Sequence, residues 1–234
     1  MQTRIPSRCA LISSFMAVLF LFTTRSQAGT MWTDWTSFTV GGNGGGSATG
    51  SVGGIGVSYS GELDGASISG ISPIWAPNSS FIGGTVTASP SVTGDDLRLN
   101  GSSTGTNTIT FASLVQNPVL AIWSLGSPSI GATFTFNATP TVEAGGPNSQ
   151  YGGASITAVG NVVSGNEGNG VVQFTGTFTS ISWTNTFENF YAFTVGMNGP
   201  ASPVPEPVSL SLVGLALVGL MFRLRKQSHR KLSA

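Results

Sequence analysis

The middle of the chain is built from short runs in which apolar and polar residues alternate. Phe134 and Phe136 alternate with threonines, whereas residues 120–123 are apolar at every position. Alternation with a period of two predicts a strand with one buried face, and a short continuous apolar run predicts a strand buried on both faces. These strand-like runs occupy residues 108–111, 118–125, 132–137, 171–178, 181–184 and 190–197.

Clusters of Gly, Asn and Ser separate these runs, and no window between them shows the 3.6-residue period of an amphipathic helix. Near Thr179 and Ser180 the apolar positions change parity, which predicts a tight turn or a β-bulge. The glycine-rich segment 41–56 predicts a hairpin region that is either flexible or packed through its glycines. Short strands with turn signals between them predict an all-β fold, a β-sandwich or jelly-roll-like ectodomain over residues 29–199.

The N-terminal segment departs from this pattern. Two arginines precede an uncharged, mostly apolar run over residues 9–22, and small residues then lead to Ala28 and Gly29. This is the three-part pattern of a secretory signal peptide. We therefore expect residues 1–28 to direct export through the Sec translocon and to be removed by signal peptidase between Ala28 and Gly29.

At the other end, a proline-rich spacer over residues 200–207 leads into an uncharged apolar segment over residues 208–222. The prolines keep the spacer extended, because each fixes φ and lacks a backbone donor. We expect the apolar segment to be a short transmembrane helix, which the aliphatic stems of flanking arginines lengthen. The tail 223–234 is expected to stay in the cytoplasm because of its five bases, Arg223, Arg225, Lys226, Arg230 and Lys231.

The order of these C-terminal parts resembles the PEP-CTERM sorting domain. Its motif residues here are Val204, Pro205, Glu206 and Pro207, and the apolar segment and basic tail follow. The resemblance implies processing by an exosortase, a membrane-embedded Cys-dependent protease, in a bacterium that makes extracellular polysaccharide. We expect the protein to be anchored transiently in the inner membrane and then to reach the cell surface or extracellular matrix. A plain membrane anchor is the alternative.

Charge and composition narrow the chemistry of the body. Residues 29–199 hold one basic residue, Arg98, and eight acids, so their formal charge is −7. An acidic body argues against nucleic-acid binding. The same stretch has no His, Cys or Lys, which excludes a Ser–His–Asp triad, a thiol protease, a Schiff base and a His-ligated zinc. We therefore expect a protein that is not an enzyme and that uses no cofactor.

A carboxylate-based, glycan-active enzyme is the remaining catalytic alternative, because glycosidases need only two acids. No spacing in the sequence singles out a pair, and most acids stand beside turn residues, where we expect them to be solvated. A loop calcium site is a further alternative, but no EF-hand spacing is present and we predict no metal site. The acids that these alternatives would draw on are Glu62, Asp64, Asp95, Asp96, Glu143, Glu167 and Glu188.

Carbohydrate binding is the second alternative function, since tryptophan rings can stack on sugar faces. The parity and apolar neighbours of Trp123 and Trp183 indicate core positions. Trp75 stands between Pro73 and Pro77, and we predict that it is exposed and contacts glycan. The main prediction is nonetheless a structural or adhesive protein of an exopolysaccharide matrix or biofilm, with polysaccharide as a partner.

Overall fold

The computed structural model describes residues 29–102 and 105–199, which is the predicted ectodomain apart from two residues of one loop. The predicted signal peptide, proline spacer, transmembrane helix and basic tail lie outside the described residues. Within the described ranges, no helix is long and apolar enough to cross a membrane.

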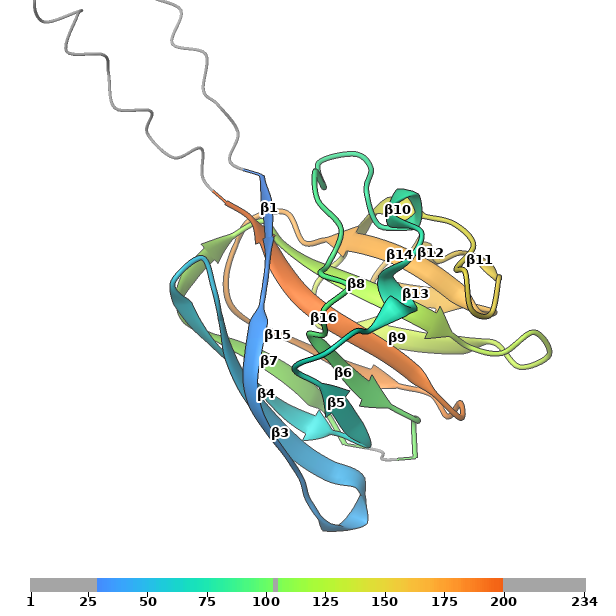
Figure 1. Ribbon diagram of the computed structural model, residues 1–234, viewed down its shortest axis with the longest axis horizontal. Helices are drawn as coiled ribbons and strands as arrows, with labels where there is room; N and C mark the ends of the chain where they lie inside the picture. Colours follow the sequence, from blue (N-terminus) through green and yellow to red (C-terminus); the bar gives the residue numbers. More distant parts are fainter. Residues whose placement is uncertain (1–28, 103–104, 200–234) are drawn as a thin grey trace, which may run out of the picture.

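Strands make up most of the described chain, which confirms the all-β prediction (Figure 1). Three short 3-10 helices accompany them, η1 Gly42–Gly44, η2 Pro73–Trp75 and η3 Asn78–Ser80. The strands are β1 Thr30–Trp32, β2 Asp34–Val40, β3 Gly45–Val52, β4 Ile55–Glu62, β5 Gly65–Ser67, β6 Asp96–Leu99, β7 Asn107–Gln116, β8 Pro118–Leu125, β9 Ala132–Phe136, β10 Thr141–Gly145, β11 Ala154–Ser155, β12 Thr157–Val159, β13 Val162–Gly165, β14 Gly168–Gln173, β15 Thr177–Asn185 and β16 Tyr191–Asn198.

The strands form two 8-stranded sheets. Sheet A has the order β10-β14-β8-β16-β6-β5, with β1 also paired to β16 and β11 to β14, and sheet B has the order β12-β13-β9-β15-β7-β4-β3-β2. From β6 to β9, and again from β13 to β16, successive strands alternate between the sheets. The resulting order, β14-β8-β16-β6 facing β13-β9-β15-β7, is that of a jelly roll. The prediction of an all-β, sandwich-like body is therefore confirmed.

The core between the sheets is aromatic at its centre. The ring of Trp183 in β15 lies 5.7 Å from Phe134 and Phe136 of the same sheet, and 5.0 Å from Phe193 of sheet A. Tyr59 stacks on its other side at 6.1 Å. Trp183 is 1% exposed, which confirms its predicted core position.

The strand predictions are confirmed for the most apolar runs and wrong for one boundary. β8 is buried at every position and lies between β14 and β16, as predicted for residues 118–125. The predicted strand 171–178 is two strands, because the chain leaves sheet A after β14 and enters sheet B at β15, with Gly176 at φ +124° between them. The parity change is a β-bulge in β15, between Phe178 and Ser180.

The glycine-rich segment forms the hairpins β2–β3 and β3–β4, and it is packed rather than loose. A Cβ on Gly50 would lie 2.3 Å from the carbonyl oxygen of Asp34, and one on Gly46 would lie 2.6 Å from that of Thr39. These glycines let neighbouring backbone approach more closely than any side chain would permit.

A second, smaller apolar cluster lies on the outer face of sheet A. The segment between β5 and β6 crosses this face and places Trp75 and Phe81 against Ala121 and Trp123 of β8. Trp32 of β1 donates its indole N–H to the carbonyl of Ala88 at 2.8 Å, which fixes the same segment.

Candidate functional site at the Arg98 end of sheet A

The two ends of the described chain meet at one end of the sandwich. Thr30 of β1 pairs with Asn198 of β16, and the Thr30 hydroxyl donates to Asn198 Oδ1 at 2.7 Å. Figure 1 shows both ends of the coloured ribbon at the same corner. The predicted sorting motif, Val204 to Pro207, lies outside the described residues and begins six positions after Asn198.

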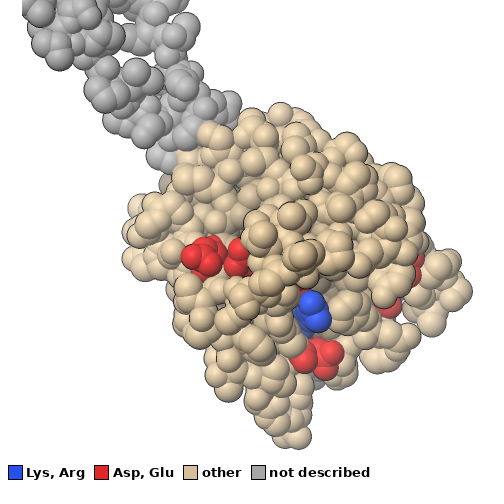
Figure 2. Space-filling model, in the orientation of Figure 1, with Lys and Arg blue, Asp and Glu red and all other residues tan. Residues whose placement is uncertain are grey.

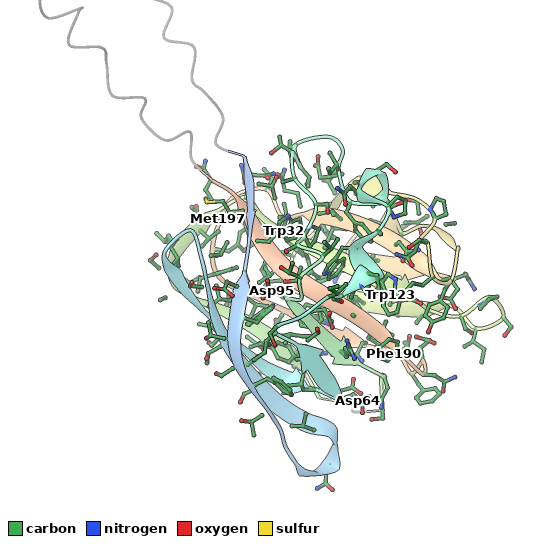
Figure 3. The ribbon with its side chains drawn as sticks, viewed as in Figure 1. Trp32, Asp64, Asp95, Trp123, Phe190 and Met197 are labelled. Atoms are coloured by element: carbon green, nitrogen blue, oxygen red, sulfur yellow. The ribbon has the colours of Figure 1, made fainter. Side chains whose placement is uncertain are left out.

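The opposite end of the sandwich is formed by loops that lie far from this corner. β16, Tyr191–Asn198, spans the distance between the two ends of the sandwich. Figure 3 labels Met197 near the chain ends and Phe190, just before the strand, at the far end. The loops beside that far end expose Ile130 and Phe187, whose exposed fractions are 59% and 58%. Large apolar side chains gathered on one surface commonly mark contact with a partner.

Arg98 of β6 pairs with Ala192 near the start of β16, and its side chain is partly exposed. Its Nε lies 2.8 Å from Asp96 Oδ1, and its guanidinium carbon lies 5.7 Å from the centre of the Phe190 ring. Figure 2 shows Arg98 as the blue patch, with acidic side chains close to it. The Phe190 ring packs edge-on against Trp123 at 5.4 Å, and the exposed Tyr151 covers Trp123 at 5.3 Å. The arrangement offers one cation beside exposed aromatic surface.

The structure brings two of the predicted acids together at the edge of this surface. Glu188 accepts a hydrogen bond from the backbone N–H of Phe190 at 3.2 Å. Burial raises the pKa of Glu188, and the nearby carboxylate of Glu167 raises it further, whereas backbone donors oppose the shift. Glu167 in turn accepts a short hydrogen bond from the hydroxyl of Ser124. Both acids belong to loops that precede strands of sheet A, Glu167 before β14 and Glu188 before β16.

Replacing Glu188 with glutamine should remove a pH dependence from stability. The unfolded carboxyl ionises near pH 4.5, whereas the folded one holds its proton to higher pH. The folded state therefore binds more protons in this window, so wild-type stability should fall as the pH rises from 4.5 through the folded pKa. The Glu188→Gln variant should lack this fall and melt above the wild type at pH 7.

Thermal melts of both proteins at several pH values, followed by circular dichroism, measure the effect. At pH 3 the carboxyl is protonated in both states, so the two proteins should differ least there, which gives the internal control. Parallel melting curves across the whole range would show that Glu188 is not the group responsible.

The expectation that the acids are solvated is wrong for three of them. Glu62, Asp96 and Glu188 are 3%, 0% and 7% exposed. Burial is tolerated because each carboxylate has partners. Asp96 pairs with Arg98 on one oxygen and accepts from the hydroxyl of Ser72 on the other, at 2.7 Å.

Glu62 is the centre of a buried polar network that sequence reasoning missed. Its Oε1 accepts from the backbone N–H of Ser102 at 2.8 Å, and its Oε2 accepts from Asn185 Nδ2 at 2.7 Å. Asn107 donates to Asn185 Oδ1 at 2.6 Å and accepts from the hydroxyl of Tyr59. Burial raises the pKa of Tyr59, so its hydroxyl stays a donor. The network satisfies polar groups where β4 and β15 end and β7 begins.

Glu143 and Asp95 are also engaged in local structure, whereas Asp64 is exposed, as predicted. Glu143 Oε2 accepts from the backbone N–H of Thr85 at 2.7 Å. Asp95 Oδ1 accepts from the N–H of Trp35 at 2.9 Å, and burial raises the pKa of Asp95. Across residues 29–102 and 105–199, no group of three or more His, Cys, Asp or Glu side chains is arranged to hold a metal ion.

The predicted exposure of Trp75 is wrong. Trp75 is 0% exposed, and its ring packs edge-on against Phe81 at 5.2 Å. Pro73 begins η2, and the resulting 3-10 turn directs the indole onto sheet A instead of into solvent. Trp75 is therefore not a glycan contact in this fold. The exposed aromatic residues at this end are Tyr151 and Phe187, which carry no sequence signal beyond their position in polar loops.

The C-terminal pattern has a counterpart among known families. The family model of the PEP-CTERM protein-sorting motif matches residues 203–226, which confirms the predicted resemblance. No curated protein and no solved structure is detectably similar to the chain. The chain thus carries a PEP-CTERM sorting motif at residues 203–226, and this signal implies export to the cell envelope or surface and processing by an exosortase.

Proposed function

We propose that this exported protein is a non-enzymatic, structural or adhesive component of an exopolysaccharide matrix or biofilm. The Sec translocon exports it, signal peptidase cuts after Ala28, and the segment 208–222 anchors it transiently in the inner membrane. An exosortase then recognises residues 204–207 and transfers or releases the body to the cell surface or the matrix.

The observation that best supports this proposal is the pairing of Thr30 with Asn198. Because both ends of the described chain lie at one end of the sandwich, the sorting tail attaches there and the opposite, Arg98 end can face outward. The body then meets its surroundings through an intact jelly roll, and no internal element is needed to reach the tail. This geometry suits a module that is displayed on a surface.

Two alternatives are less well supported. Carbohydrate binding through Trp75 is not supported, because that side chain is buried. A carboxylate-based enzyme would have to use Glu167 and Glu188, but Ser124 and the backbone of Phe190 already occupy oxygens of these acids.

The proposal is tested in the native host with an antibody against residues 29–199. In intact, unpermeabilised cells the antibody should label the surface, and the protein should co-purify with the extracted matrix. A deletion strain should form a matrix that sheds more polymer on washing, and the wild-type gene should restore retention. Labelling that appears only after permeabilisation, or unchanged polymer retention in the deletion strain, would contradict the proposal.

A further inference from the structure

The outer face of sheet B carries a regular array of hydroxyl groups. On five adjacent strands, β2, β3, β4, β7 and β15, two neighbouring rows of outward positions run across the sheet and carry only Ser and Thr, whereas the next row includes Asp34, Ser51 and Gly56. One row is Thr39, Ser47, Ser60, Thr108 and Ser182, and the other is Ser37, Thr49, Ser58, Thr110 and Ser180. All ten positions are Ser or Thr. We call these ten residues the hydroxyl grid.

The grid has a fixed spacing, because strand pairing sets it. Neighbouring hydroxyl-bearing residues within a row are about 4.8 Å apart, and the two rows are about 7 Å apart. Five strands therefore present a strip about 19 Å long. On β3, β4, β7 and β15 the residue between these positions faces the core, namely Ala48, Tyr59, Ile109 and Ile181.

The grid is accessible and its hydroxyls are mostly uncommitted. Seven of the ten residues are exposed, and Thr108, Ser180 and Ser182 are half-buried. Ser37 and Thr49 share one hydrogen bond, 2.7 Å between their hydroxyl oxygens. Among the described residues, the other eight side chains make no hydrogen bond with the protein. They remain free to donate to a ligand and to accept from it.

The strands that carry the grid are almost free of charge. Asp34 begins β2 and the buried Glu62 ends β4, and no other acid or base occurs in the eight strands of sheet B. Exposed strands and sheet edges in soluble proteins usually carry lysine or glutamate, which keep them soluble and unpaired. The two rows of the grid carry no charged residue, which the β fold does not require.

We propose that the hydroxyl grid binds a neutral polysaccharide chain laid across the strands. A polyhydroxylated polymer offers repeated hydroxyls, each of which is both donor and acceptor, so it can exchange hydrogen bonds along a repeating row of Ser and Thr. Neither surface carries an ion, so contact costs no desolvation of charge. The inference rests on the proposed function and names its partner.

Charge decides between polymer classes. The body carries −7 with one base, and that base lies on sheet A. An acidic polysaccharide would meet repulsion and no cation on the grid, whereas a neutral polymer is indifferent to the field. Face-to-face binding of a second copy would bury hydroxyls with little apolar gain, and it forms an alternative outcome of the test.

Affinity electrophoresis of the full-length protein in mild detergent tests the proposal. Gels contain dextran, galactomannan or hydroxyethyl cellulose as neutral probes, and alginate as the acidic probe. At least one neutral probe should retard the protein, and alginate should not. The isosteric triple variant Thr49→Val, Ser58→Ala, Thr110→Val removes three adjacent hydroxyls and should weaken binding about tenfold or more. A Ser58→Arg variant should do the same by bulk and charge.

The matched control removes the same groups from exposed loops, with Ser69→Ala, Thr139→Val and Thr175→Val. It should bind like the wild type, and circular dichroism should show all variants folded. The proposal is overturned if no neutral probe retards the wild type, or if the grid variants bind as the control does. It is also overturned if sedimentation shows a dimer that the grid variants abolish. The proposed function is tested separately, by surface labelling and matrix retention. Failure of the grid proposal would therefore leave the proposed function standing.

Discussion

Replacing Trp183 by alanine should destabilise the jelly roll by about 3–5 kcal/mol. Its ring is 1% exposed and packs within 5.0–6.1 Å of four other rings, from both sheets. Truncation would leave a cavity that stiff neighbouring strands cannot close. A domain is stable by only about 5–15 kcal/mol in total, so this one change could remove a large part of the free energy of unfolding.

Urea unfolding of the full-length protein, followed by far-ultraviolet circular dichroism, measures the loss. Phe187→Ala is the matched control, because it removes an aromatic ring that is 58% exposed, and it should change the free energy of unfolding by less than about 0.5 kcal/mol. If the two variants unfold at the same urea concentration, Trp183 is not the centre of the core and the packing between the sheets is misassigned.

Local pattern predicted the elements whose environment is uniform. β8 is buried at each position, because it lies between β14 and β16 and both faces of its sheet are covered. The mostly apolar run in the sequence therefore gives both boundaries of the strand, Pro118 and Leu125. The bulge at Ser180 could also be predicted, since an inserted residue changes the parity of every later side chain.

The predictions that were wrong concern residues whose burial or strand membership depends on tertiary contacts and not on the local sequence pattern. Prolines around Trp75 suggested an exposed turn, but the turn lies on an apolar sheet face that only the tertiary structure creates. The stretch 171–178 has the pattern of a single strand, yet its two ends belong to different sheets. Polar residues beside glycines suggested solvated acids, but strand ends converge at Glu62 and supply its partners from Ser102 and Asn185.

The hydroxyl grid could not be predicted because it depends on register between distant segments. Each strand shows only an alternation of Ser or Thr with buried residues, which is ordinary for a solvated strand. The row appears when Thr110 pairs with Ser58 on one side and Ser180 on the other, across separations of 52 and 70 positions. No local window contains that information.

Replacing Glu206 with alanine should block sorting and leave the body folded. Glu206 is the one charged residue between positions 200 and 222, and it lies inside the matched sorting motif. The apolar segment and the five bases are unchanged in the variant, so anchoring and orientation should persist. Recognition by the exosortase should fail, and most of the protein should accumulate in the membrane fraction as uncut precursor.

Fractionation with an antibody against the body, combined with the size of the detected band, distinguishes precursor from processed protein. Ser202→Ala lies just outside the matched segment and serves as the control, which should be processed like the wild type. The body should remain folded in both variants, because the Thr30–Asn198 pairing closes the sandwich before the spacer begins. If the Glu206→Ala chain is cut and exported normally, the acid is not read by the protease. Residues 208–234 would then act as a plain anchor that follows prolines, and delivery to the matrix would need another route.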